Sequence, residues 1–328
     1  MTRKLLLAVA ALAAAGTAQA FDFRAAPPAA EARAGGPGAT RFVLELDGHP
    51  VGYLRSATGG DATSEVITLT PGAGGLPKKH IGSPKYDDLV LEVGADLPPE
   101  LAAWIRSTLA GNWVRKNGAV VGLDWNGVPR WRRTFSFGLV TGLLFPALDA
   151  GSREPFTLGV VITPEFTRLD RKPAATRLTV PGSNKKSGAT TANFAISVGN
   201  LDTSRVTRVE AFAVSVVLTE GAVGETRDYE KTPSKLVVPD LLVTVHDARA
   251  DGWWAWFDDF VVRGNSTDAS EVQASISILD GRGAPALRLD LDHVGISALR
   301  FLPAGAAEDG PTRDQARLYA ERIALTSP

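Results

Sequence analysis

The sequence predicts a mostly β protein with two tandem small antiparallel β-barrel or sandwich domains, each with one α-helix. Three observations lead to this prediction: short segments of alternating apolar and polar residues, one amphipathic helix in each half, and an internal repeat. Alternation with a period of two is typical of half-buried strands. A single helical stripe then covers one face or end of a sheet.

The internal repeat appears as a constant spacing between similar segments. Residues 42–46 and 194–198 alternate in the same way and stand 152 positions apart. Residues 89–93 and 241–245 have the same spacing, as do 103–105 and 255–257. The later matches stand 156 positions apart; they are Asp124 and Asp280, Pro129 and Pro285, and Phe145 and Phe301. This pattern predicts a duplication with one small insertion.

The first half contains one clear helix, at 98–110. Pro98 and Pro99 open it, and its apolar residues lie at helical spacing on one face. A similar stripe in the second half is made by Trp253, Trp256, Phe257 and Phe260. Strands are predicted at 41–47, 63–70, 88–94, 118–124, 130–138 and 156–163.

Residues 1–20 have the pattern of a secretory signal peptide. Arg3 and Lys4 precede an apolar run, and Ala18-Gln19-Ala20 offers a cleavage site. The run is shorter than the roughly 20 residues of a membrane span, and no later segment is apolar enough to cross a bilayer. We therefore expect an exported protein, periplasmic or extracellular, with no membrane span after cleavage.

Composition divides the remaining chain into four parts. Residues 21–40 are rich in Ala, Pro and Gly and predict a flexible leader. Residues 164–192 carry a net charge of +4 without a sustained apolar face, which predicts a basic linker. The predicted domains are then 41–163 and 193–328, with net charges of 0 and −7. The positive linker either docks on the negative domain of its own chain or attracts a neighbouring subunit, or these charges are simply solvated.

The residue counts exclude several classes of protein. Lys plus Arg is 35 and Asp plus Glu is 36, whereas a dedicated nucleic-acid binder needs an excess of basic residues. The chain has no Cys, which excludes disulfides, zinc fingers and thiol catalysis.

No pattern of catalytic or metal-binding residues stands out. Asp290, Asp292 and His293 are close in sequence, but on a strand the two carboxylates share one face and His293 points to the other. The sequence also lacks a Gly-x-Ser-x-Gly elbow and a phosphate-binding loop after a strand. We expect no enzymatic activity, no cofactor and no metal.

Six stretches of the first half follow one another in a characteristic order. They are residues 41–48, 51–52, 77–80, 84–91, 103–105 and 115–118. In this order they resemble the contractile-phage tail tube family, which is related to the tube proteins of type VI secretion. The second half resembles the family more weakly, through residues 255–257 and 316–322, and it lacks the Arg-Lys-Asn-Gly stretch.

The resemblance implies two tail-tube-type domains that assemble into rings or tubes. Because such rings hold six similar domains, a chain with two of them implies a trimer with pseudo-sixfold symmetry. The predicted function is therefore an exported, non-enzymatic structural protein whose partner is itself. The alternative is a secreted monomeric two-domain β binding module for an extracellular or cell-surface ligand.

One segment of the first half is the candidate assembly loop. Residues 70–87 are long for a connection between strands, and they hold Lys78, Lys79, His80 and Lys85. The equivalent stretch of the second half, 220–239, is mixed in charge. We expect these loops to pair the first domain of one subunit with the second domain of the next.

Overall fold

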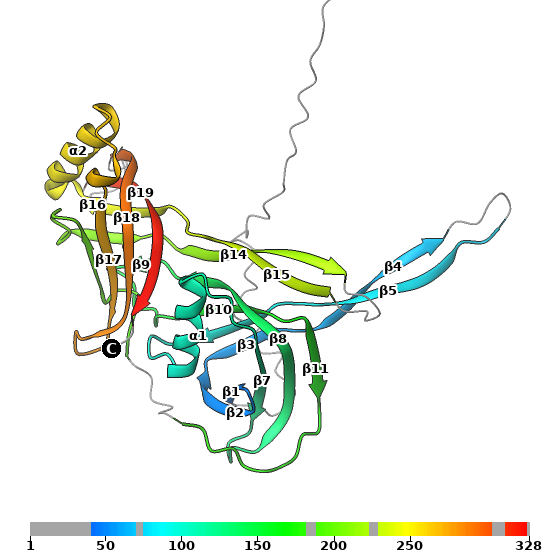
Figure 1. Cartoon of the computed structure of the whole chain (residues 1–328). Helices are drawn as coiled ribbons and strands as arrows, with labels where there is room; N and C mark the ends of the chain where they lie inside the picture. The colour runs from blue at the N-terminus through cyan, green and yellow to red at the C-terminus, as the bar shows by residue number, and fades with distance from the viewer. Residues whose placement is uncertain (1–40, 70–74, 182–187, 223–228, 304–311, 327–328) are drawn as a thin grey trace, which may run out of the picture. The chain divides into compact units, whose positions relative to one another are not determined.

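The computed structural model describes residues 41–69, 75–181, 188–222, 229–303 and 312–326. The predicted signal peptide and leader lie outside these residues. The described part is mostly β, as predicted, with its strands in a ten-stranded, a seven-stranded and a two-stranded sheet (Figure 1). It contains no helix that is both long and apolar enough to cross a membrane.

The first half of the chain forms most of the ten-stranded sheet. Its main strand order is β2-β1-β7-β8-β10-β6-β3, and β11 pairs with β8. The strands of this sheet from the first half are β1 (Arg41–Leu46), β2 (His49–Leu54), β3 (Ser56–Gly59), β6 (Leu89–Val93), β7 (Lys116–Leu123), β8 (Pro129–Phe145), β10 (Leu158–Thr163) and β11 (Phe166–Asp170). The two-stranded sheet is a hairpin of β4 (Ala62–Leu69) and β5 (Lys78–Tyr86).

The long strand β8 lets the first sheet curl around its core. Its first part pairs with β7 on one side and β11 on the other, whereas its last part pairs with β10. The helix α1 (Pro99–Leu109) begins with a proline and buries Leu101, Trp104 and Ile105. The indole Nε1 of Trp104 donates a hydrogen bond of 2.8 Å to the carbonyl of Val114, which fixes the helix against the chain that follows it.

The sequence prediction missed the strands β2, β3 and β5 and placed the start of the linker too early. β2 contains Pro and Gly, β3 is only four residues long, and β5 lacks alternating apolar residues. The candidate assembly loop 70–87 is therefore largely the strand β5, which is held by its pairing with β4. The predicted linker 164–192 begins with β11, because residues 166–170 pair with β8.

The second half forms six strands of the seven-stranded sheet, whose order is β12-β17-β18-β19-β16-β13-β9, and the edge strand β9 comes from the first half. The strands of this sheet are β9 (Leu148–Asp149), β12 (Phe194–Val198), β13 (Val206–Val209), β16 (Leu241–His246), β17 (Val272–Leu279), β18 (Pro285–Leu302) and β19 (Arg313–Thr326). The helix α2 (Asp251–Phe257) continues into a π-helix (Asp258–Val262) and buries Trp253 and Phe260. A second hairpin, β14 (Phe212–Ala222) and β15 (Tyr229–Val237), completes this half.

The two halves have the same order of elements. The path β12-β17-β18-β19-β16-β13 follows the path β1-β7-β8-β10-β6-β3 strand for strand. In each half a hairpin stands between the second and third of these strands along the chain, and a helix follows the strand after the hairpin.

Strand register agrees as well. The pair Val160 and Leu143 of the first sheet corresponds to Ala316 and Leu299, each 156 positions later. The bulge in β8 opposite β10 recurs at the corresponding position of β18 opposite β19. Because register is set residue by residue, this agreement is much more specific than a shared strand order.

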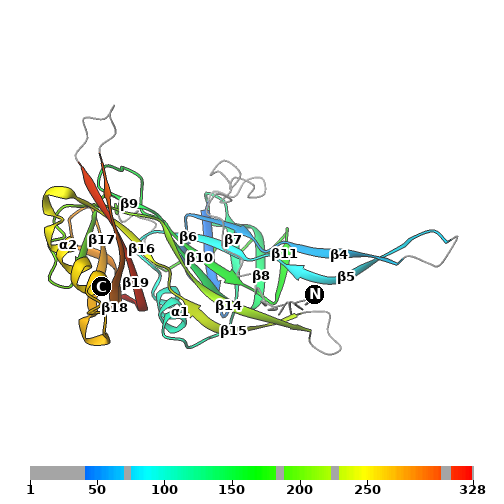
Figure 2. The ribbon, with the colours of Figure 1, turned by 90° about the horizontal axis from the view of Figure 1, so that it is seen from above.

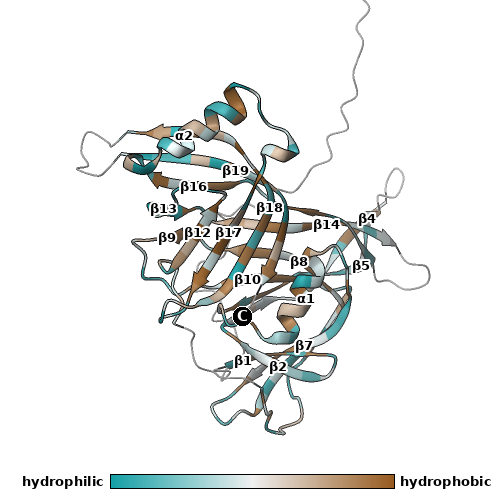
Figure 3. Ribbon diagram, turned by 60° about the vertical axis from the view of Figure 1, so that its left-hand side comes forward, coloured by the Kyte–Doolittle hydropathy of each residue, from teal (hydrophilic) through white to brown (hydrophobic). Residues whose placement is uncertain are grey.

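The apolar core is continuous across the two halves. One cluster of buried residues includes Leu44 and Trp104 of the first half together with Val243 and Trp253 of the second. Figure 3 shows the apolar residues along the sheet strands. The helix α1 contacts β19, so the halves share a packed boundary.

Candidate assembly surface

The hairpin β4–β5 carries all four residues of the predicted assembly loop. Lys78, Lys79, His80 and Lys85 lie on β5, and all are exposed. Lys85 pairs with Glu65 of β4 at 3.4 Å, an ion pair within the hairpin itself. Figure 2 shows the hairpin reaching beyond the strands of the ten-stranded sheet.

This hairpin exposes large apolar side chains as well as lysines. The exposed fractions are 61% for Val66, 48% for Ile67, 52% for Leu69 and 72% for Ile81. Among the described residues, β4 and β5 pair only with each other. An exposed edge with apolar side chains is a template for pairing with another strand.

The second hairpin, β14–β15, is docked on the first half of its own chain. β14 pairs antiparallel with the end of β8, so that Phe212 stands opposite Phe145 and Ser215 opposite Gly142. The rings of Phe212 and Phe145 stack with centroids 4.7 Å apart. Phe212 and Val214 are buried in the common core. The sequence prediction that the 220–239 stretch pairs with another subunit is thus incomplete, since this hairpin docks within the chain.

A polar seam runs beside this strand pairing. Arg115 forms ion pairs of 3.4 Å with Glu165 of the first half and with Glu230 of β15. It also donates a hydrogen bond of 2.9 Å to the carbonyl of Lys231. Lys231 is buried, and its backbone N–H donates to Glu165 at 3.3 Å.

Asp88 lies next to this seam. Burial raises the pKa of the Asp88 carboxyl above its ordinary value, although a 2.6 Å hydrogen bond from Thr163 and the charge of Lys231 act in the opposite direction. The positive charge of Lys231 therefore offsets part of the desolvation cost of this carboxylate.

A second contact joins the halves through β9 and β13. Arg208 of β13 donates to Asp149 of β9 at 2.6 Å and to Glu210 at 2.7 Å. The hydrogen bond to Glu210 and the charges of both carboxylates raise the pKa of Arg208 above its ordinary value. The guanidinium therefore stays charged, and it links the two halves at the edge of the second sheet.

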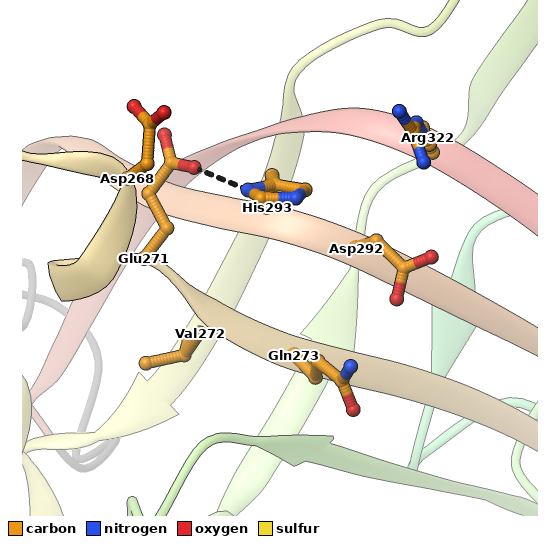
Figure 4. A pocket seen from close by; sticks show the side chains of 7 residues that line it. All are labelled: Asp268, Glu271, Val272, Gln273, Asp292, His293 and Arg322. Carbon is orange, nitrogen blue, oxygen red and sulfur yellow. Dashed lines mark hydrogen bonds and ion pairs between the residues drawn. The ribbon is translucent and has the colours of Figure 1, made fainter.

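The second half carries an acidic cavity of about 330 Å³ beside β18. Its lining includes Asp268, Glu271, Asp292, His293 and Arg322 (Figure 4). Glu271 accepts a hydrogen bond of 2.7 Å from the hydroxyl of Tyr319 and contacts Nδ1 of His293 at 2.9 Å. Burial and then the Glu271 carboxylate raise the pKa of Tyr319 to about 12.

The side-chain directions predicted from the sequence for Asp290, Asp292 and His293 are wrong. Asp292 and His293 both line it, because His293 has a positive φ of 53° at a bulge, which interrupts the alternation of β18. Asp290 instead pairs with Arg288 at 2.6 Å. The described residues contain no group of three or more metal-ligating side chains.

Residues 38–162 match the family described as T4-like virus tail tube protein gp19. This match confirms the resemblance to the tail tube family that the sequence showed for its first half. The family supports a structural, tube-like role for the protein.

Solved structures that match part of the chain come from contractile injection systems. The anti-feeding prophage cap matches with a TM-score of 0.38 and 14% identity over 48% of this chain and 99% of that chain. The sheath/tube terminator of the extracellular contractile injection system PVC matches with a TM-score of 0.35 and 20% identity, over 40% of this chain and 93% of that chain. At these values the likeness carries no functional argument. Among curated proteins, none matches the chain.

Proposed function

We propose that this protein is a non-enzymatic structural subunit that associates with copies of itself into rings or tubes. The observation that carries the proposal is the hairpin β4–β5, which exposes Val66, Ile67, Leu69 and Ile81 on two strands that pair with no other strand of the described chain. The tail tube match of residues 38–162 supports the same role.

We further propose that residues 193–328 form a second, diverged tail-tube-type domain after the first at 41–163. The strand order and register shared by the two sheets support this proposal. Two such domains in one chain lead to the expectation of a trimer with pseudo-sixfold symmetry, in which three chains supply six domains.

Export is the remaining part of the proposal. The pattern of residues 1–20 supports a periplasmic or extracellular location for the assembly. N-terminal sequencing of the protein recovered from a periplasmic fraction tests it. The expected first residue is Phe21, and a retained Met1 in a cytoplasmic fraction contradicts it.

Electron microscopy of the purified protein tests the structural role. The expected images show rings or tubes of uniform diameter. Isolated particles of single-chain size at tens of micromolar contradict the role and favour the secreted monomeric binding module instead.

A further inference from the structure

The two hairpins occupy corresponding positions but differ in their surroundings. Adding 152 to the pairs Ala62–Tyr86 and Ser64–Pro84 of β4–β5 gives Val214–Val238 and Val216–Leu236, and the second of these is an observed pair of β14–β15. Val216 is buried, whereas Ser64 is exposed. One hairpin is therefore docked and its counterpart is not.

The surface that receives the docked hairpin also has a counterpart. β14 pairs with residues 142–145 of β8, and 156 positions later these become residues 298–301 of β18. In β18, pairing with β17 ends at Val294, whereas pairing with β19 continues to Leu302. The edge of residues 298–301 that faces away from β19 is therefore open in the described chain, and Phe301 is 51% exposed.

The charges of the docked seam recur with their signs exchanged. Arg115 and Glu230 form an ion pair in the docked contact. The counterpart of Arg115, 156 positions later, is Glu271, and the counterpart of Glu230, 152 positions earlier, is Lys78. Both members change sign, so the pair stays complementary. Glu271 lines the acidic cavity of the second half (Figure 4), and this cavity, of about 330 Å³, is large enough for a lysine side chain.

Two further pairs of positions are complementary. Lys231 lies near Asp88 in the docked contact, and the counterparts are Lys79 and Asp240. Ala213 stands opposite Leu144. The counterpart of Ala213 is Asp61, and the counterpart of Leu144 is Arg300. Complementary charges across an interface fix its register and suppress wrong pairings.

The helices show the same difference between a covered and an open surface. α1 contacts β19, and its residues Ala102 and Leu109 are buried. Their counterparts at the α2 end of the second half, Trp254 and Val261, are 37% and 41% exposed. The second half thus presents an apolar helical surface where the first half is covered.

We infer that the hairpin β4–β5 of one copy docks on the second half of another copy, in the register of the contact seen within the chain. This inference rests on the proposed function. β4 is added antiparallel to residues 298–301 of β18, with Ala62 opposite Leu299 and Thr63 opposite Ala298, and Lys78 enters the cavity at Glu271. The contact is heterologous, so its repetition gives a closed ring or an open filament.

Cysteine cross-linking tests the register, because the chain contains no Cys of its own. We expect the double variant Thr63→Cys/Ala298→Cys to form disulfides between chains under mild oxidation, seen as a ladder above the single chain on a non-reducing gel. A mixture of Thr63→Cys and Ala298→Cys single variants is expected to stop at covalent dimers. Paired strand positions lie within the ~7 Å Cα separation that a disulfide permits.

Two controls accompany this experiment. In Thr63→Cys/Leu302→Cys the second cysteine is moved four residues along β18, about 13 Å at the rise of a strand, so no ladder is expected. Ala213→Cys/Leu144→Cys places cysteines at partner positions of the docked contact, so it is expected to form a disulfide within one chain. It shows that the oxidation conditions are effective.

The outcomes separate the inference from the proposed function. A ladder from Thr63→Cys/Ala298→Cys and none from Thr63→Cys/Leu302→Cys supports both the inferred register and the proposed self-assembly. If light scattering shows oligomers but the matched variant stays at single-chain size, or the shifted control cross-links equally well, the register is wrong and the structural role stands. If light scattering shows only single chains, both fail.

Discussion

Phe137 and His293 stand 156 positions apart and share an uncommon backbone conformation, with φ of 52° and 53°. Each lies in the long strand of its half, β8 or β18. A bulky residue at positive φ costs about 1–2 kcal/mol, and such a residue is uncommon in a strand. The same irregularity at the same place in both sheets supports our proposal that the halves are copies of one fold.

The positive φ at Phe137 predicts that variants at this position differ in their free energy of unfolding. The side chain is 53% exposed, so its removal sacrifices little packing. We expect Phe137→Gly to leave the free energy of unfolding within about 0.5 kcal/mol of the original, since glycine adopts positive φ without strain. Phe137→Val is expected to destabilise by about 1–2 kcal/mol, because a β-branched residue suits this region least. Urea denaturation measures both, and a Val variant as stable as the Gly variant contradicts the assigned backbone.

The lysines of the hairpin are expected to differ in their effect on assembly. Lys78→Gln/Lys79→Gln removes the two charges that face acidic groups in the inferred contact, so we expect weaker self-association with unchanged circular dichroism. Lys85→Gln is the matched control, since Lys85 pairs with Glu65 inside its own hairpin. Sedimentation velocity at low salt measures the change, and equal weakening by both variants argues against specific contacts at Lys78 and Lys79.

The buried tryptophans predict which helix residues carry stability. Trp104 and Trp253 are almost fully buried, and both indoles donate hydrogen bonds, to Val114 and Asp202. We expect Trp104→Ala and Trp253→Ala each to cost about 3–5 kcal/mol. The apolar stripe predicted from the sequence includes Trp256 and implies a similar cost there, but Trp256 is only half-buried, so we expect Trp256→Ala to cost less than about 3 kcal/mol. Urea denaturation measures the free energy of unfolding of each variant. A larger loss for Trp256→Ala than for Trp253→Ala contradicts this prediction.

Asp314 predicts a pH-dependent cost to stability. Its side chain is fully shielded from solvent, and among the described residues neither carboxylate oxygen has a hydrogen bond of good geometry, although the Trp254 indole lies close enough to favour the carboxylate in part. Burial and then the nearby Asp247 raise the pKa of Asp314. A carboxyl whose pKa is raised on folding binds its proton more tightly in the folded chain. Its cost is therefore absent below the ordinary pKa and grows as the pH rises through the raised one.

The first half has Leu158 at the position that corresponds to Asp314. We expect Asp314→Leu to raise the free energy of unfolding by about 1–3 kcal/mol at pH 7, and by less at pH 4. Glu321→Leu, an exposed position on the same strand, is the control and is expected to give no such gain. A gain at Asp314 that is equal at both pH values contradicts the raised pKa.

Sequence reasoning predicted the strands that alternate clearly and missed those that do not. Residues 89–93 face the core on one side, and their burial has a period of two. Residues 42–46 are apolar apart from Glu45, and both faces of this strand are buried. Residues 78–86 have no such face, since both sides of β5 are mostly exposed. Pairing with β4 defines that strand, and pairing is not visible in the composition of a single segment.

Only one side of the inferred contact could be proposed from the sequence. Its lysines were found because cationic residues gather in one segment without a core pattern. The acceptor edge at residues 298–301 depends on where pairing with β17 ends, at Val294. The exchange of signs between the pair Arg115 and Glu230 and the pair Glu271 and Lys78 was present in the sequence. It becomes visible only when the docked contact shows which positions face each other.

The mass of the protein in solution tests self-assembly most directly. We expect light scattering at tens of micromolar, at low salt, to give a mass that is an integral multiple of one chain, with three chains as the proposed unit. At moderate salt the mass is expected to fall in part, because the apolar hairpin contact remains while the charge pairs are screened. A mass of one chain at both salt concentrations contradicts the account.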